Sequence, residues 1–160
     1  MDDGIYPNNK KLPLLVYKGA IRKATNDLAS IFEQLFEINQ WDQSWRNGIY
    51  GFHHYHSTAH EVLGVYGESV NVQLGGEKGI ELTVNKGDVV IIPAGVAHKN
   101  LGASSDFAVV GAYPFGQHWD ICYGKSEERP RANVNIARVS LPRRDPVYGA
   151  RRYLINFWND

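Results

Sequence analysis

Cysteine is almost absent from this chain: Cys122 is the only one among 160 residues. A single thiol cannot form an internal disulfide, and it excludes a zinc site built from several cysteines. Because no motif of reactive cysteines surrounds Cys122, we expect it to be a buried, inert thiol.

The chain also lacks net charge and long apolar runs. Its 17 basic and 17 acidic residues balance, so the charge favours neither a nucleic-acid partner nor an anionic membrane. The arginines of the C-terminal third indicate a solvated or partner-binding surface. No stretch has the length that a transmembrane helix needs, and the acidic start, residues 1–4, does not resemble a signal peptide. We therefore expect a cytoplasmic protein.

One amphipathic helix is predicted, over residues 26–39. Thr25 or Asn26 can cap its first turn, and Asp27 favours the positive end of the helix. Apolar side chains recur on one face at Leu28, Ile31, Phe32, Leu35 and Phe36. Such a stripe is typical of a helix that covers a core.

Short predicted strands dominate the rest of the chain. Apolar or alternating segments separated by glycine-rich turns are typical of an all-β sandwich or barrel. These segments cover residues 14–17, 49–56, 61–67, 70–74, 81–84, 89–92 and 107–113. At this length we expect a single domain, residues 1–160. Its predicted parts are an N-terminal arm and strand (1–24), the helix (26–39), a core barrel (48–123) and a C-terminal extension of extended chain (124–160).

Four of the six histidines fall within residues 53–60, directly before Glu61. His54 and His56 are two positions apart, so on a strand their side chains point to the same face. Glu61 on the next strand can reach the same interior, and the bend after residue 92 can bring His98 there. The pattern therefore predicts one site inside a barrel.

Three imidazoles and one carboxylate suit Fe, Mn, Co, Ni, Zn or Cu(II) better than Ca or Mg. Four protein ligands leave positions open on an octahedral ion, as a catalytic metal requires. We predict one divalent transition metal (Fe, Mn, Zn, Ni or Co) at His54, His56, Glu61 and His98. The alternative, structural polar residues in a barrel, would leave buried groups without partners.

These residues follow the two motifs of the cupin superfamily. The first motif reads Gly48, five residues, His54-Tyr55-His56, four residues, Glu61 and then Gly67, one position early. The second reads Gly87, five residues, Pro93-Ala94-Gly95, two residues and His98, followed by Asn100, two positions early. These departures concern turns rather than ligands. The resemblance implies a double-stranded β-helix, a jelly-roll-like barrel with the helix packed outside, and a homodimer.

The whole chain also resembles small bacterial single-domain cupins of the YjlB type, which implies no defined substrate. The resembling segments are residues 7–9, 45–48, 54–61, 75–77 and 145–149.

Three side chains are weak catalytic candidates. Tyr50 and Tyr113 can donate hydrogen bonds to a metal-bound substrate, or they can be ordinary core residues. His60 should face away from the site, as should His53, unless a bulge turns His60 inward as a ligand or base. His118 belongs to no motif. By strand parity the expected interior lining is Tyr50, Phe52, Leu63, Val65, Gln73, Tyr113 and Phe115.

Two function classes remain open from the sequence. The first is a metalloenzyme that acts on a small molecule, of the dioxygenase, isomerase or decarboxylase type. The second is a non-catalytic module that binds or senses a small ligand.

Overall fold

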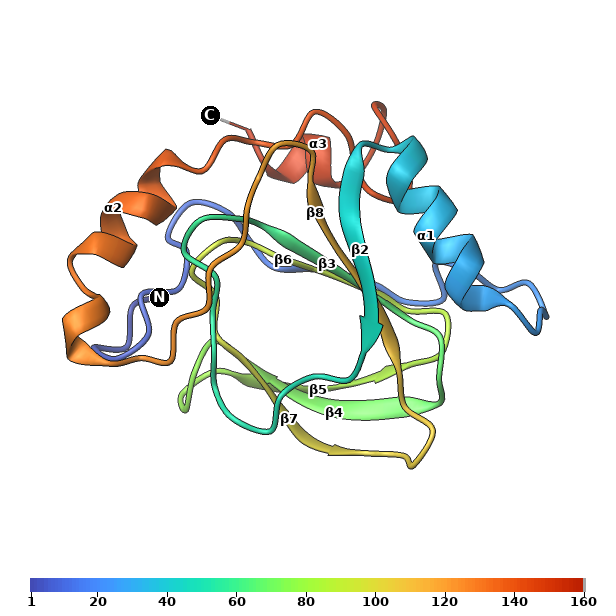
Figure 1. Cartoon of the computed structure of the whole chain (residues 1–160), viewed down its shortest axis with the longest axis horizontal. Helices are drawn as coiled ribbons and strands as arrows, with labels where there is room; N and C mark the ends of the chain where they lie inside the picture. Colours follow the sequence, from blue (N-terminus) through green and yellow to red (C-terminus); the bar gives the residue numbers. More distant parts are fainter. Residues whose placement is uncertain (160) are drawn as a thin grey trace.

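The computed structural model describes residues 1–159, which form two antiparallel β-sheets facing each other (Figure 1). The larger sheet has the strand order β1-β6-β3-β8-β2, and the smaller has the order β5-β4-β7. The strands are β1 (Leu15–Tyr17), β2 (Trp41–Asn47), β3 (Glu61–Val65), β4 (Ser69–Leu74), β5 (Ile80–Asn85), β6 (Val89–Ile92), β7 (His98–Ala103) and β8 (Val109–Pro114). The helical segments are α1 (Leu28–Ile38), the 3-10 turn η1 (Ser126–Glu128), α2 (Arg131–Arg138) and α3 (Leu154–Phe157). The predicted all-β fold, a jelly-roll-like double-stranded β-helix, is confirmed. None of the helices in residues 1–159 is long and apolar enough to cross a membrane.

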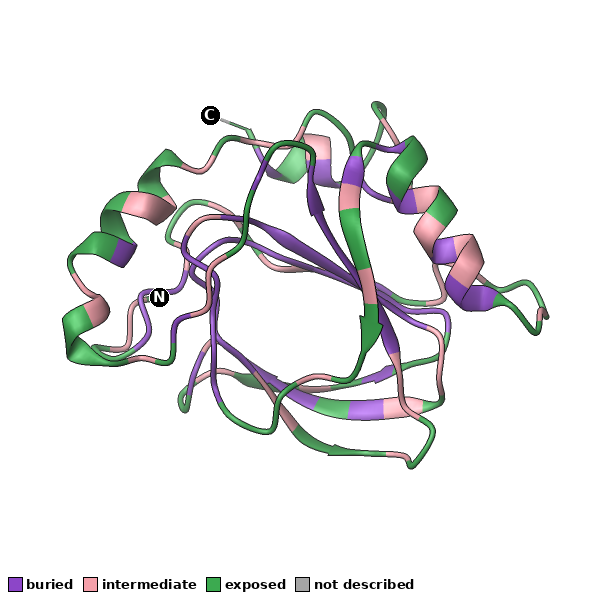
Figure 2. Cartoon of the chain, viewed as in Figure 1, coloured by how far each residue is buried: buried purple, intermediate pink, exposed green. Residues whose placement is uncertain are grey.

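The three central strands of the larger sheet, β6, β3 and β8, are buried on both faces and are purple in Figure 2, whereas the edge strand β2 is largely exposed. In β6, Val89 and Ile91 join the core under the helices, whereas Val90 and Ile92 join the core between the two sheets. The period of two along a strand therefore separates two cores. Burying each such side chain contributes roughly 1.5 to 3 kcal/mol. This accounts for the unbroken apolar run in β6.

Helix α1 packs on the outer face of the larger sheet, alongside β2 (Figure 1). Phe32 is fully buried there and lies directly over Gly64 of β3. A Cβ at Gly64 would lie 2.7 Å from the Phe32 ring, so only glycine allows this approach. The predicted caps were wrong by one or two positions. Asp27 is the N-cap, and its carboxylate accepts the Ser30 N–H at 3.3 Å.

The C-terminal extension is not the extended chain that we predicted, because it contains η1, α2 and α3. A fully buried carboxylate, Asp145, anchors its last part. Asp145 accepts hydrogen bonds from the Tyr17 hydroxyl of β1 and from the Leu154 N–H at 3.0 Å. Short helices that pack on a finished barrel depend on such tertiary contacts, which local periodicity does not reveal.

The predicted strand over residues 49–56 is also wrong. The strand lies earlier, at β2, and residues after it cross between the sheets with isolated bridges at His54 and Tyr55. β2 and β7 escaped prediction because both are edge strands rich in polar residues. With β1 and β2 paired into the larger sheet, the barrel extends beyond the predicted range 48–123.

Candidate metal centre

The four predicted ligands reach one point from three parts of the fold. His54 and His56 lie between β2 and β3, Glu61 begins β3, and His98 begins β7. Two main-chain hydrogen bonds join the sheets here: His54 N–H to His98 O at 3.2 Å, and His98 N–H to His54 O at 2.9 Å. Tyr55, between the two histidines, points into a separate apolar cluster. The predicted alternation therefore holds even though the segment is not a regular strand.

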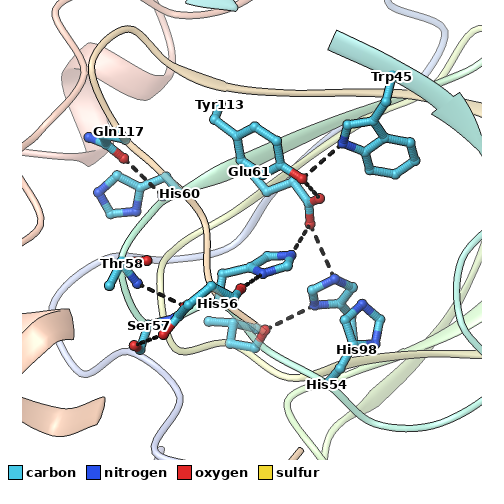
Figure 3. Close-up of polar contacts among 12 residues, drawn as sticks. Trp45, His54, His56, Ser57, Thr58, His60, Glu61, His98, Tyr113 and Gln117 are labelled. Atoms are coloured by element: carbon cyan, nitrogen blue, oxygen red, sulfur yellow. Dashed lines mark hydrogen bonds and ion pairs between the residues drawn. The ribbon is translucent and has the colours of Figure 1, made fainter. Parts of the chain in front are cut away.

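The four side chains converge inside the barrel (Figure 3). The ligand atoms of His54, His56 and His98 all lie within 4.8 Å of one another. Glu61 Oε2 lies 3.4 Å from His56 Nε2 and 3.2 Å from His98 Nε2. The four residues are between 2% and 7% exposed. The site is thus a compact mixed nitrogen and oxygen shell, withdrawn from bulk water.

Each of the three imidazoles has its Nδ1 against a main-chain carbonyl oxygen. These oxygens belong to Phe52 (3.1 Å from His54), Asp120 (beside His56) and Val96 (3.1 Å from His98). A carbonyl oxygen only accepts, so Nδ1 carries a hydrogen, and in the neutral imidazole Nε2 then presents a lone pair. The three Nε2 lone pairs point into one space, and a hydrogen bond at Nδ1 holds each ring in place. Metal-ligating histidines have this arrangement.

Glu61 is oriented by a chain of two hydrogen bonds (Figure 3). The Trp45 indole N–H donates to the Tyr113 hydroxyl oxygen at 2.8 Å. An indole nitrogen can only donate, so the Tyr113 O–H is left to donate to Glu61 Oε1 at 3.2 Å. Oε1 therefore accepts the Tyr113 hydrogen bond, and Oε2 faces the imidazoles.

The histidines and Glu61 of this cluster strongly affect one another's pKa values. Burial would raise the pKa of Glu61, but His56 and His98 lower it well below its usual range. Burial, and then the neighbouring His98, lower the pKa of His54 to about 3. Burial lowers the pKa of His56 as well, yet Glu61 outweighs this effect and raises that pKa. An ionised carboxylate therefore faces a place where a positive charge, a proton or a metal ion, is favourable.

The residues present fit a divalent transition metal. Glu61 Oε2 is buried and accepts no hydrogen bond from the residues that the structure describes. Without a cation its lone pairs face the lone pairs of the Nε2 atoms, which costs free energy in a buried site. Imidazole nitrogen with one carboxylate oxygen suits Fe, Mn, Co, Ni or Zn. A cation at this point would satisfy all four groups together.

The other histidines of the cluster lie elsewhere. His60 is 1% exposed, its Nδ1 accepts the Ala94 N–H at 2.9 Å, and its ring packs on Trp158. Burial lowers the pKa of His60 to about 4. His53 also points away, with Nε2 3.1 Å from the Glu77 carboxylate. Both residues therefore face away from the centre, the orientation expected from strand alternation, and no bulge turns His60 into it.

Two further expectations concern residues outside the centre. Cys122 is buried, and burial raises the pKa of its thiol to about 12, as expected of an inert cysteine. His118 is exposed on the loop that follows β8.

A cavity of about 280 Å³ opens above the four ligands. Three of the predicted lining residues, Tyr50, Leu63 and Tyr113, do line it. Four others do not: Phe52, Val65, Gln73 and Phe115. Sequence reasoning missed the lining residues Trp45, Ile49, Trp119 and Ile121.

Trp45 reaches this cavity because β2 is irregular. The register against β8 shifts between Asp42 and Trp45, and such bulges redirect side chains. The indole then lies over Gly111 of β8, where a Cβ would come within 2.2 Å of the ring. The sequence held one signal for Trp45: it lies close before Gly48, the first residue of the first histidine motif.

Asp120 was also missed, although it holds the turn that carries His56. Its carboxylate accepts the Ser57 N–H at 2.6 Å, the Thr58 N–H at 3.3 Å and the Ser57 hydroxyl. Its main-chain oxygen meets His56 Nδ1. One residue thus fixes both the turn and the imidazole tautomer.

The two facing sheets form a cupin-type double-stranded β-helix, and the three histidines and Glu61 lie inside it. No protein-family model matches the chain. The chain is 41% identical over 157 residues to the uncharacterised protein YjlB of Bacillus subtilis (strain 168), covering 98% of this chain and 92% of the relative. The chain therefore belongs to the YjlB family.

Solved structures share part of the fold. Acireductone dioxygenase from Bacillus anthracis, solved with a cadmium ion in its active centre, matches 74% of this chain and 82% of its own, at 10% identity and a TM-score of 0.43. Procruciferin, an 11S globulin from Brassica napus, matches 49% of this chain at 21% identity and a TM-score of 0.40. This chain spans only 21% of the globulin. Scores this low support no conclusion about function.

Proposed function

We propose that this protein is a metal-binding cupin that holds one divalent transition metal at His54, His56, Glu61 and His98, and that it is a small-molecule metalloenzyme. One observation carries the metal proposal. Three Nε2 lone pairs and an unpartnered carboxylate oxygen meet in a buried space, and each is fixed from behind by a hydrogen bond. A metal ion at this place would give the three Nε2 lone pairs and the carboxylate oxygen a common partner.

The cavity supports an enzymatic role, because the ligands lie at the base of a space that opens to solvent. When bound, a divalent metal supplies a Lewis acid to an oxygen atom of a ligand. The three catalytic candidates do not supply an independent acid or base. His60 lies outside, the Tyr113 O–H is engaged by Glu61, and Tyr50 lies 55% exposed at the rim. Chemistry of the dioxygenase, isomerase or decarboxylase type therefore rests on the metal.

Metal analysis tests this proposal. Protein purified without a histidine tag should contain about one transition-metal ion per chain. His54→Ala and His98→Ala should each lose it, whereas His118→Ala, at an exposed position, should retain it. Circular dichroism of each variant checks that the fold is kept. Full metal occupancy in both ligand variants would contradict the assignment.

Turnover separates the enzyme from the alternative, a non-catalytic cupin that binds or senses a small ligand. A metal-loaded protein that binds a ligand and returns it unchanged, with every candidate metal, would favour the second role.

We also propose a cytoplasmic homodimer. The edge strand β1 supports the dimer, since Leu14, Leu15 and Val16 are only partly buried and one side of this strand has no partner among the described residues. Light scattering after size exclusion should give about twice the mass of the 18.0 kDa chain, and a monomer mass would refute it.

A further inference from the structure

Aromatic side chains form much of the wall of the cavity above the candidate metal centre. Four aromatic side chains line it: Trp45, Tyr50, Tyr113 and Trp119. Three aliphatic side chains complete the apolar wall: Ile49, Leu63 and Ile121. At about 280 Å³ the space lies at the lower end of small-molecule sites. Its shape and surface therefore suit a small, largely apolar molecule.

Two of these rings stand at the rim with much of their surface in water. Tyr50 is 55% exposed and Trp119 is 48% exposed. The Tyr50 ring centroid lies 5.1 Å from that of His54, and the Trp119 centroid lies 5.7 Å from that of His56. A molecule that reaches the imidazoles passes along these two rings, and covering them removes apolar surface from water.

The wall offers no free cation for an acidic group on the ligand. Among the described lining residues other than the histidines, Glu61 and Arg46 are the charged side chains. Arg46 is already engaged: its Nε lies 3.2 Å from the Glu33 carboxylate, and its Nη2 donates to the Ser30 hydroxyl at 3.2 Å. The Tyr113 O–H is likewise committed to Glu61. An acidic group on the ligand therefore finds no free cationic side chain on this wall, and the metal end is the place that favours negative charge.

We propose that this cavity takes a small molecule with a flat, aromatic body and one oxygen-bearing end. The flat body lies against Trp119 and Tyr50, and the oxygen end reaches the space between His54, His56 and His98. This inference rests on the proposed metal centre, since the metal receives the oxygen end.

Three hydroxamates test the inference, because they share one oxygen-donor group and differ only in the body. Benzohydroxamate has a flat ring, cyclohexanecarbohydroxamate has a puckered ring of similar size, and acetohydroxamate has a methyl group. Calorimetric titration of the zinc-loaded protein should show benzohydroxamate binding about tenfold more tightly than acetohydroxamate. The puckered compound should fall between them. Equal affinities for the three compounds would overturn the proposal.

Variants at the rim show whether the rings cause the difference. Trp119→Ala and Tyr50→Ala should each remove most of the advantage of benzohydroxamate over acetohydroxamate, measured on samples of equal zinc content. If both variants keep the full advantage, the proposed position of the flat body is wrong. Elemental analysis of the same samples separates the two proposals. A protein that takes up none of the candidate metals (Fe, Mn, Zn, Ni or Co) refutes the metal centre and this inference together, whereas a metal-loaded protein that does not distinguish the three probes refutes this inference alone.

Discussion

Removing the hydroxyl of Tyr113 should weaken metal binding without removing any ligand. Tyr113→Phe deletes the O–H that donates to Glu61 Oε1 and the oxygen that accepts the Trp45 N–H. Glu61 would then lose its one fixed donor and gain freedom to rotate. Because outer partners of metal ligands typically contribute 10- to 100-fold in affinity, we expect a loss of about that size, or roughly 1.4 to 2.8 kcal/mol.

The same variant should destabilise the metal-free protein. It leaves a buried carboxylate oxygen and a half-buried indole N–H without their partners. At about 1 to 3 kcal/mol for each such group, we expect a total of roughly 2 to 6 kcal/mol. For a chain of this length that lowers Tm by roughly 4 to 24 °C. Differential scanning calorimetry of metal-free protein measures this loss, and competition with a chelator of known affinity measures the loss of metal binding.

Trp45→Phe provides the matched control. It removes the indole N–H but leaves the Tyr113 O–H free to donate to Glu61, so stability should fall while metal affinity stays within about threefold of the unaltered protein. The reasoning fails if Tyr113→Phe binds metal as tightly as the unaltered chain. It also fails if Trp45→Phe and Tyr113→Phe lose the same affinity, because the hydroxyl would then have no separate role.

Two further predictions concern the frame around the site. Asp145→Ala should lower the free energy of unfolding by about 3 kcal/mol or more, since it leaves the Tyr17 hydroxyl and several main-chain N–H groups without their acceptor. Chemical denaturation measures this loss. An effect as small as that of Arg143→Ala, a change at an exposed position, would refute the prediction. Asp27→Ala should lower the free energy of unfolding by about 1 kcal/mol, because it removes the N-cap of α1, whereas Asn26→Ala should leave it nearly unchanged. Thermal melts measure both effects, and the reverse order would show that Asn26 is the cap.

The sequence predicted the four candidate ligands because their chemistry is local. His54 and His56 needed only an alternating backbone, which the two isolated bridges at His54 and Tyr55 maintain without a regular strand. Glu61 needed only a place on the inner face of β3, which it shares with Leu63 in the strand. Period-two reasoning therefore placed His54 and His56 on the same side of the chain even where the strand it assumed does not exist.

The walls of the site were harder to predict, because they depend on partners far away in the chain. Trp119 lies on an irregular loop, and no periodicity places such a residue in a cavity. Trp45 reaches the cavity through a bulge and over a glycine of another strand. The same reason explains why α2 and α3 were missed, since tertiary contacts such as those of Asp145 stabilise elements too short to form alone.

The contacts of Trp45, Tyr113 and Glu61 connect the fold of the barrel to the proposed function. β8 carries both Gly111, whose missing side chain admits the Trp45 ring, and Tyr113, whose hydroxyl that ring orients. The hydroxyl in turn fixes the Glu61 carboxylate, and the two rings form part of the cavity wall. The residues that shape the space for a ligand are therefore the same residues that hold a candidate metal ligand in place. A change that removes the Tyr113 hydroxyl must alter metal affinity as well as the cavity wall, whereas a change at Trp45 or at the rim residue Trp119 can alter ligand preference alone.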